Sequence, residues 1–313
     1  MSTALPLGGA ALLPGLLLAV TWAAVAADAV AAGRAAGRPV SWTVALGLPG
    51  REAVRLLVGQ RRRTAAGDEL LRGIGGAALL VAALMAAAVL PLGLRPVADL
   101  GPGLVWFNAM EVVAWAAVWL VGWGANSTVS LIGGYRFVAQ GLAYELPHMF
   151  ALITAAVGAQ SLRVTDVVAA QQGLWFIVIM PVAFVAFLLS AAAMAFWGPF
   201  DAPVGRDVAG GAAAELSGVD RLVFSTGRWL LLVASSAMAV PLFLGGGHGP
   251  WLPAWAWVLV KTLAVLGVLI VLRHRVPTIR MERWTEFSWV VLVPATIAQA
   301  LVVTLVVLGR GGI

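Results

Sequence analysis

The sequence contains no cysteine and few charged residues. Among 313 residues there is no Cys, which excludes thiolate-ligated iron–sulfur clusters, cysteine-based zinc sites and disulfides. Charged residues make up 11% of the chain and hydrophobic residues 61%, whereas about a quarter of a soluble globular domain is charged. The composition therefore predicts an integral membrane protein.

Lysine and histidine are also scarce. Lys261 is the only lysine, so the formal net charge of +6 comes almost entirely from arginine. In a membrane protein this balance indicates topology and contact with anionic lipids more than nucleic-acid binding. The three histidines, His148, His248 and His274, are far apart in the sequence. Bis-histidine haem ligation is not expected, and no Walker loop, catalytic triad or metal-ligand motif is present.

Long apolar runs dominate what remains. A helix needs about twenty apolar residues to span a bilayer, and the first run lacks the features of a cleaved signal peptide, so we expect a retained helix there. No repeat and no long linker divides the chain, which favours one membrane domain over residues 1–313. Eight runs qualify as spans, near 7–30, 73–93, 103–123, 129–160, 173–197, 222–245, 252–272 and 286–308.

The arginines predict the orientation of these spans. With both termini outside, the inward loops are 31–72, 124–128, 198–221 and 273–285, and only Arg95, Arg163 and Arg310 lie on the outer side. Arginine is enriched in inward loops of membrane proteins, so this asymmetry favours that orientation. The fourteen inward arginines are Arg34, Arg38, Arg51, Arg55, Arg61, Arg62, Arg63, Arg72, Arg206, Arg221, Arg273, Arg275, Arg280 and Arg283.

The first inward loop carries a helical pattern of its own. In "WTVALGLPGREAVRLLVGQRRR", Leu48, Val54, Leu57 and Val58 recur near helical spacing, and the charged side chains lie elsewhere around the helix. This pattern predicts a short amphipathic helix at the membrane interface.

Polar residues inside the spans are candidates for function, because burying an ion in hydrocarbon is costly. Arg136, Gln140 and Tyr144 follow one face of their helix, whereas Glu145 lies about half a turn away. Arg136 and Glu145 therefore need different partners. Pro147 leaves a backbone carbonyl free beside the acid, which predicts a proton or water site there. The full set is Asp28, Asn108, Glu111, Arg136, Gln140, Glu145, Arg228, Lys261 and Gln299.

Each of these residues also has a purely structural interpretation. Arg228 and Lys261 are long enough to reach the interface or to neutralise a neighbouring acid. Glu111 is placed to face Glu145 from the preceding span, and His148 is interpreted as a packed residue. Asp28 lies near the inner end of the first span, where solvation costs little.

The segment "GWGANSTVSLIGGYRFVAQGLAYE" (122–145) resembles the signature of the H subunit of NADH-quinone oxidoreductase, respiratory complex I. In that family a Gly-Trp-x-x-Asn-Ser run leads into Arg-x-x-x-Gln-x-x-x-Tyr-Glu. "GPFDAPVG" (198–205), "LFLGG" (242–246) and "RHRVPTIRMERWTEFSWVVLVP" (273–294) resemble later family motifs in the same order. The resemblance is clearest over residues 95–300.

This resemblance implies a membrane-arm subunit without a redox centre of its own. The family docks the peripheral arm, walls the chamber where quinone is reduced, and links that chamber to proton pathways in the bacterial cell (inner) membrane. The implied partners are other membrane-arm and peripheral-arm subunits, the lipid bilayer and quinone, with no nucleic acid. The quinone-chamber or docking candidates are Arg34, Arg136, Phe200, Asp201, Arg273 and Arg280. The proton-path candidates are Glu111, Gln140, Tyr144, Glu145, Asp207, Glu215 and Lys261.

The chain also departs from the family pattern. The first inward loop reads "ADAVAAGRAAGRPVSW", where only Asp28 and Gly33-Arg34 resemble the family. The acid-rich stretch after the Pro-Phe-Asp motif is reduced to Asp207 and Glu215, and Arg228 takes the place of a customary glutamate. An arginine there favours ionised acids nearby.

These departures keep two other functions open. One is a membrane anchor and ion conduit in a membrane-bound hydrogenase or ferredoxin-linked complex. The other is a free-standing transporter, which the absence of a pseudo-repeat disfavours.

Overall fold

The computed structural model describes residues 7–93, 96–205 and 210–311, and within these ranges it is all-helical. The elements are α1 (Leu7–Ala35), α2 (Trp42–Val58), α3 (Glu69–Ala87), α4 (Gly103–Gly124), α5 (Thr128–Ala159), α6 (Val164–Ala169), α7 (Phe176–Ile179), α8 (Pro181–Met194), the 3-10 turn η1 (Ala202–Val204), α9 (Gly218–Phe243), α10 (Ala254–Arg275), α11 (Met281–Phe287), the π-helical turn η2 (Ser288–Leu292) and α12 (Val293–Gly311).

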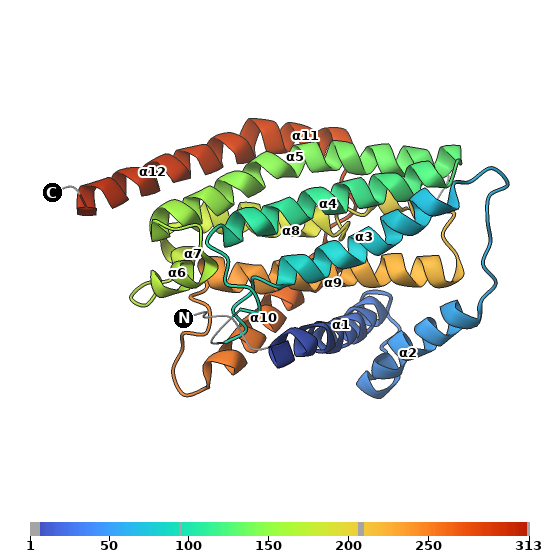
Figure 1. Ribbon diagram of the computed structural model, residues 1–313, viewed down its shortest axis with the longest axis horizontal. Coiled ribbons are helices and arrows are strands. Elements are labelled where there is room, and N and C mark those ends of the chain that lie inside the picture. Colours follow the sequence, from blue (N-terminus) through green and yellow to red (C-terminus); the bar gives the residue numbers. More distant parts are fainter. Residues whose placement is uncertain (1–6, 94–95, 206–209, 312–313) are drawn as a thin grey trace.

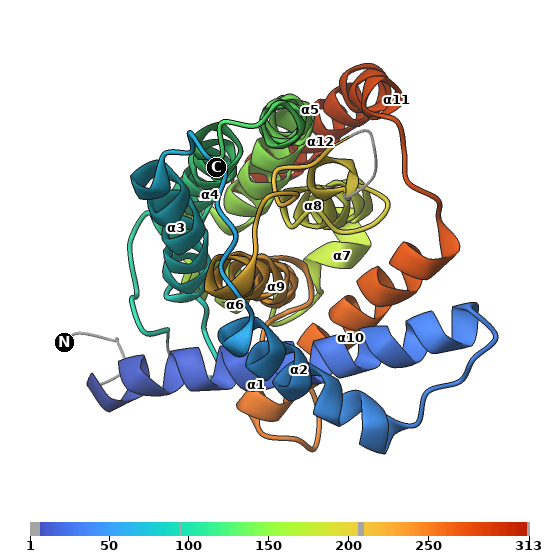
Figure 2. The ribbon, with the colours of Figure 1, turned by 90° about the vertical axis from the view of Figure 1, so that its right-hand side faces the viewer.

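The helices form a membrane bundle, as the sequence predicts. In the described part of the chain seven helices are long and apolar enough to cross a membrane, and the shorter apolar α8 completes a bundle of eight. Helices α3, α4, α5, α9 and α12 run along the long axis (Figure 1), while α1 crosses the bundle obliquely when viewed along that axis (Figure 2). Helix α9 lies in the middle (Figure 2), and all its residues from Leu230 to Phe243 are buried.

The fifth span, expected near 173–197, is divided into two helices in the structure. That region contains α7 and α8, which are separated at Met180 (φ −129°, ψ 49°). Pro181 causes the break, because proline lacks a backbone donor and disfavours helical geometry in the residue before it. The opening N–H of Ala183 donates 2.6 Å to the side-chain oxygen of Gln299 on α12, so a neighbouring helix satisfies this helix end.

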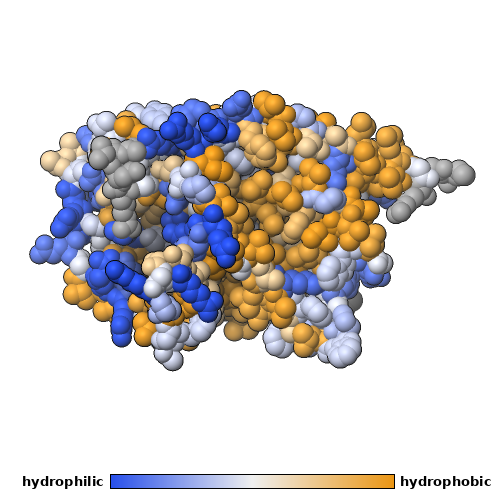
Figure 3. Space-filling model, turned by 180° about the vertical axis from the view of Figure 1, so that it is seen from behind, coloured by the Kyte–Doolittle hydropathy of each residue, from blue (hydrophilic) through white to orange (hydrophobic). Residues whose placement is uncertain are grey.

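The short amphipathic helix predicted in "WTVALGLPGREAVRLLVGQRRR" is present as α2. The hydroxyl of Ser41 caps its start by accepting from the N–H of Val44 at 3.4 Å. The apolar side chains Val54, Leu57 and Val58 are exposed on this chain, as expected for a face that meets lipid. Seen from behind, hydrophilic residues gather mainly toward one end of the molecule, a broad hydrophobic surface covers the middle, and a smaller hydrophilic group lies at the opposite end (Figure 3).

That hydrophilic end is formed by the loops between α1 and α3, between α8 and α9, and between α10 and α11, and is called here the arginine-rich end. Arg61 forms an ion pair with Asp220 at the start of α9, and this hydrogen bond and charge attraction raise the pKa of Arg61. The buried Arg72 of α3 approaches the same carboxylate at 3.5 Å. The backbone N–H of Arg62 donates 2.7 Å to Ser217. The loop before α3 is therefore fastened to the first turn of α9.

Lys261 fastens the opposite end of the bundle. Its Nζ donates to the carbonyls of Leu244, Gly246 and His248 at 2.6, 2.9 and 2.7 Å. These carbonyls follow the C-terminus of α9, where a cation is favoured by the helix dipole. The ammonium also lies 4.0 Å from the ring centroid of Trp175, close enough for a cation–π interaction.

We expect Lys261→Met to lower the free energy of unfolding by about 1–3 kcal/mol, because buried carbonyls lose their donor. The measurement is detergent-titration unfolding of the full chain in mixed micelles. The matched control is Thr262→Val, since the adjacent buried Thr262 hydroxyl has no hydrogen-bond partner among the described residues. Equal stability of the two variants would contradict this role for Lys261.

Candidate functional site

A cavity of about 620 Å³ lies between α1, α2, α9 and the C-terminal end of α10. Its apolar wall includes the indole rings of Trp22, Trp197 and Trp229. Its polar wall includes Asp28, Glu52, Ser225, Thr226, Arg221, Arg228 and Arg273. An amphipathic molecule with an aromatic or polar head and an apolar tail matches this lining, and the volume is that of a ligand pocket.

The wall beside α10 is held by a carboxylate shared between two cations. Asp28 on α1 accepts from Arg273 and contacts His274 Nε2, both at 2.8 Å. The Arg273 guanidinium also lies 4.3 Å from the ring centroid of Trp197. Asp28 thus joins the oblique α1 to the end of α10, and Arg273 is positioned as a cavity-wall residue.

The Arg228 side chain is oriented by the backbone carbonyls that follow the end of α8. Its Nε donates 3.0 Å to the Ala195 carbonyl, and a second guanidinium nitrogen donates to the Phe196 carbonyl. The guanidinium also lies 5.7 Å from the Trp197 ring centroid. The positive charge therefore caps the C-terminus of α8, which the helix dipole favours.

The loop between α8 and α9 is bound to α5 by the residues of the signature segment. Gln140 donates to the carbonyls of Ala193 and Phe200 at 2.7 and 3.1 Å, and Arg136 donates 3.2 Å to Gly210. At Gly133 an added Cβ would lie 2.0 Å from the backbone nitrogen of Ala212. Only glycine permits this close approach of the two backbones.

The first part of this loop packs on the segment after α10. Phe200 and Trp284 have ring centroids 4.4 Å apart, and Thr278 donates 3.0 Å to Asp201. Arg280 lies beside them, at the start of α11. The predicted docking residues Phe200, Asp201 and Arg280 therefore lie together at the arginine-rich end.

A second polar site lies inside the bundle between α4 and α5. Glu111 and His148 are 0% exposed, and Glu111 Oε1 lies 3.1 Å from His148 Nε2. Asn108 donates 3.1 Å to Glu145, and Trp115 donates 2.9 Å to the Tyr144 hydroxyl. Arg136 and Glu145 thus contact different neighbours, as expected, while the direct partner of Glu111 is His148.

The carbonyl left free by Pro147 already has a donor. Proline at 147 removes the N–H that would bond to Ala143, and the hydroxyl of Ser288 donates to that carbonyl instead. Ser288 begins η2, and π-helical turns are frequent at functional sites. The carbonyl of the predicted proton or water site is therefore contacted by a hydroxyl from a helix that is far away in the sequence.

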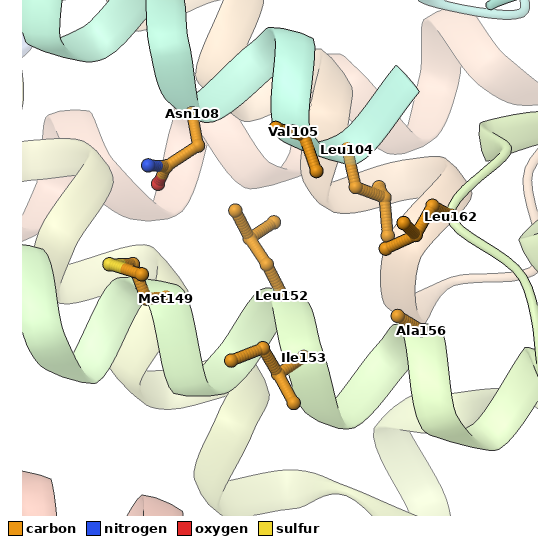
Figure 4. Close-up of a pocket in the computed structure, with 8 residues that line it drawn as sticks. All are labelled: Leu104, Val105, Asn108, Met149, Leu152, Ile153, Ala156 and Leu162. Atoms are coloured by element: carbon orange, nitrogen blue, oxygen red, sulfur yellow. The ribbon is translucent and has the colours of Figure 1, made fainter. Parts of the chain in front are cut away.

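Asn108 connects this interior site to the surface. A groove of about 120 Å³ between α4 and α5 has Asn108 and Met149 at one end and Leu104, Ala156 and Leu162 at the other (Figure 4). Apart from Asn108 its lining is apolar. This lining suits contact with an apolar molecule such as a lipid chain.

The remaining candidates lie elsewhere. Glu215 accepts 2.9 Å from Ser127 at the arginine-rich end, where Arg34 is exposed. Lys261 lies at the opposite end, on backbone carbonyls. Asp207 falls outside the described residues. Within the described ranges no group of three His, Cys, Asp or Glu residues could hold a metal ion.

Sequence reasoning missed three contributors: His148, Ser288 and Trp197. Each acts through a contact between helices, and spacing within one helix gives no signal for such contacts. The available signal for His148 was its position three residues after Glu145, with Glu111 on the preceding helix.

We expect Gln140→Met to loosen the loop between α8 and α9, because two carbonyls at its base lose their donor. The measurement is hydrogen–deuterium exchange of residues 196–217, with about a tenfold faster exchange for a loss of about 1.4 kcal/mol in local stability. Ser190→Ala is the control, since Ser190 donates to Tyr144 outside this loop. Unchanged protection in Gln140→Met would contradict the anchoring role.

Comparison with known proteins identifies the family. Residues 10–304 match the sequence model of a family described as NADH dehydrogenase. The H 1 subunit of the NADH-quinone oxidoreductase of Geobacter metallireducens is 36% identical over 265 residues, which cover 81% of this chain and 80% of that protein.

Two further relatives agree. The H 2 subunit of the NADH-quinone oxidoreductase of Geobacter sulfurreducens is 36% identical over the same shares of the two chains, 81% and 80%. The H subunit from Geobacillus kaustophilus is 33% identical over 262 residues, or 82% of this chain and 78% of that protein. The chain belongs to the NADH dehydrogenase family, as a multi-pass membrane member of the group formed by the H subunits of NADH-quinone oxidoreductases.

Proposed function

We propose that this protein is the membrane subunit of a complex I-like oxidoreductase that forms part of the quinone chamber, docks the peripheral redox arm and couples the chamber to proton translocation. The observation that carries the proposal is the cavity of about 620 Å³ beside the arginine-rich end. Membership of the H-subunit family supports the same assignment.

The cavity lining fits a quinone. Three indole rings supply flat apolar surfaces, and Ser225 and Thr226 supply hydroxyl groups near the guanidinium groups of Arg228 and Arg273. Aromatic walls with a few placed polar groups are typical of cofactor sites. Quinone, when bound, accepts two electrons and two protons, and the electrons come from centres in partner subunits.

Docking is assigned to the arginine-rich end. Phe200 and Asp201 are held against the segment that bears Arg280, and Arg34 extends from the end of α1. Because Gln140 and Arg136 bind the base of the same loop, a displacement of the docked loop is transmitted to α5.

Proton translocation is assigned to the interior of α4 and α5. Glu145 lies on α5 between Tyr144 and His148. Gln140, which binds the loop between α8 and α9, lies on the same helix five residues before Glu145. Glu111, Tyr144 and Glu145 form the inner part of the path, and Glu215 lies toward the arginine-rich end. The proposal puts this end in the cytoplasm of a bacterial cell, with both termini outside and the chain as one domain.

We expect Ser225→Phe to raise the apparent KM for quinone about tenfold, equivalent to about 1.4 kcal/mol, because the larger side chain occupies the cavity. The measurement is quinone reduction by the assembled complex, with electron transfer to a water-soluble acceptor unchanged. Val260→Phe, on an exposed face of α10, is the control. A normal KM in a correctly assembled Ser225→Phe complex would argue against the chamber.

We expect Glu145→Gln to lower proton-coupled quinone turnover about a hundredfold, the low end of what a positioned proton-transfer group contributes. The amide keeps the size of the side chain but carries no exchangeable acidic proton. Asp166→Asn is the control, since Asp166 lies in the exposed α6 at the opposite end. Unchanged turnover together with unchanged proton transfer per electron would exclude Glu145 from the path.

A further inference from the structure

A buried acid and a buried imidazole contact each other at mid-bundle, and the signature motifs do not include this pair. Glu111 on α4 and His148 on α5 are each 0% exposed, and their nearest polar atoms lie 3.1 Å apart. We propose that Glu111 and His148 form a proton-binding pair that holds one transferable proton and exchanges it with Glu145 through bound water. The pair deepens the proposed function and rests on it, because it adds a proton-holding site to the path through Glu145.

The two helices bring four polar side chains to one place. Asn108 and Glu111 are three residues apart on α4, and Glu145 and His148 are three residues apart on α5, so each pair shares a helix face. Asn108 donates 3.1 Å to Glu145 across the helix interface. Contacts among these four side chains therefore cross the interface twice, once from Asn108 to Glu145 and once from Glu111 to His148.

Aromatic packing fixes the imidazole. The His148 ring centroid lies 5.0 Å from that of Phe187 and 6.2 Å from that of Phe107. These two rings come from α8 and α4, so the imidazole is held between three helices. A ring that is held in this way keeps its nitrogen within reach of the carboxylate in either protonation state.

Net charge is the constraint that makes the pair a proton store. An isolated ion at this depth costs several kcal/mol, whereas a carboxylate with an imidazolium, or a carboxylic acid with a neutral imidazole, is neutral overall. Both arrangements contain one shared proton. The proton can therefore change its position within the pair without burying a net charge.

Unpaired polar atoms around the pair supply the exchange route. The side-chain polar atoms of Glu111 and His148, together with Glu145 Oε2 and Asn108 Oδ1, form no well-aligned hydrogen bond with the described residues, and the 3.1 Å contact within the pair is one of distance and charge. Buried polar atoms without partners are costly, and water bound at such places makes two to four hydrogen bonds. Water that bridges Glu145 to the pair satisfies these atoms and carries a proton from one to the other.

The surroundings leave few competing charges. The other titratable groups facing the pair are Glu145 and Tyr144 on α5, and α8 carries no charged residue. The charged residues of α3 lie in its first turn, and α11 lies beside the loops of the arginine-rich end. Between Val293 and Gly309, α12 has no charged residue. The proton balance of the pair is therefore governed by Glu145.

The test is infrared difference spectroscopy of the assembled complex in lipid nanodiscs, recorded between acid and alkaline buffer in H₂O and D₂O. We expect a deuterium-sensitive carboxylic-acid band that disappears in Glu111→Gln, and an imidazole band that disappears in His148→Asn. In His148→Asn the remaining Glu111 band should titrate over a different pH range. A spectrum that Glu111→Gln leaves unchanged would overturn the proposal.

A second measurement separates proton storage from packing. The double variant Glu111→Gln with His148→Asn keeps polar side chains of similar size but holds no transferable proton. We expect it to assemble, and the quinone reduction that remains to move fewer protons per electron than in wild type. A normal proton-to-electron ratio in the assembled double variant would show that the pair only packs the bundle.

The outcomes distinguish this pair from the proposed function. The infrared titration needs no turnover, so its failure removes the Glu111–His148 pair and leaves the quinone chamber intact. Normal turnover and proton transfer in Glu145→Gln would instead contradict the proposed proton path. The pH response of Glu111 would still be visible in the infrared spectrum.

Discussion

Backbone and side-chain polar groups at membrane depth must find partners inside the protein, because lipid offers none. In this chain polar side chains meet that requirement at several helix ends and at the carbonyl freed by Pro147. Gln171 is fully buried and donates to the carbonyls of Pro241 and Leu242 at 2.7 and 3.3 Å, while its oxygen accepts from the N–H groups of Phe176 and Gly245. One amide thereby closes the ends of α7 and α9.

The same device recurs around the candidate sites. Gln140 serves the carbonyls of the loop after α8, Arg228 serves the end of α8 itself, and Ser288 serves the carbonyl above Pro147. Gln140, Arg228 and Ser288 thus each donate hydrogen bonds that stabilise the local backbone, whatever other role they have. Replacing one of them removes a hydrogen bond to the backbone as well as any role in proton transfer. A loss of activity therefore does not by itself identify a proton carrier.

Much of the fold follows from the sequence, because hydrophobic length and arginine asymmetry are properties of single segments. The spans, the interfacial α2 and the separation of Arg136 from Glu145 need only helical periodicity. Pro181 predicts the break before α8 from the sequence alone. The hydrogen bond from Ala183 to Gln299, which satisfies the start of this short helix, could not be predicted because it joins two distant segments. The Glu111–His148 contact required the relative rotation of α4 and α5, which depends on small residues such as Gly122 and Gly134 packing backbone against backbone.

Arg228 shows how a charge reversal is absorbed. Where the family resemblance leads one to expect a glutamate, the guanidinium is stabilised by two backbone carbonyls and an indole ring. Asp28 meanwhile is engaged by Arg273 and His274. The cavity wall therefore carries two arginines that are already oriented, Arg228 and Arg273, beside Asp28 and Glu52, whereas the interior site between α4 and α5 holds Glu111 and Glu145.

This division separates two kinds of chemistry in the proposed mechanism. Electrostatic attraction for the reduced, anionic form of a bound quinone acts at the cavity, and proton exchange acts between α4 and α5. The link between them is mechanical, because α5 carries Gln140 against the loop beside the cavity and Glu145 against Asn108. Movement at one end of this helix therefore alters the contacts of the acid.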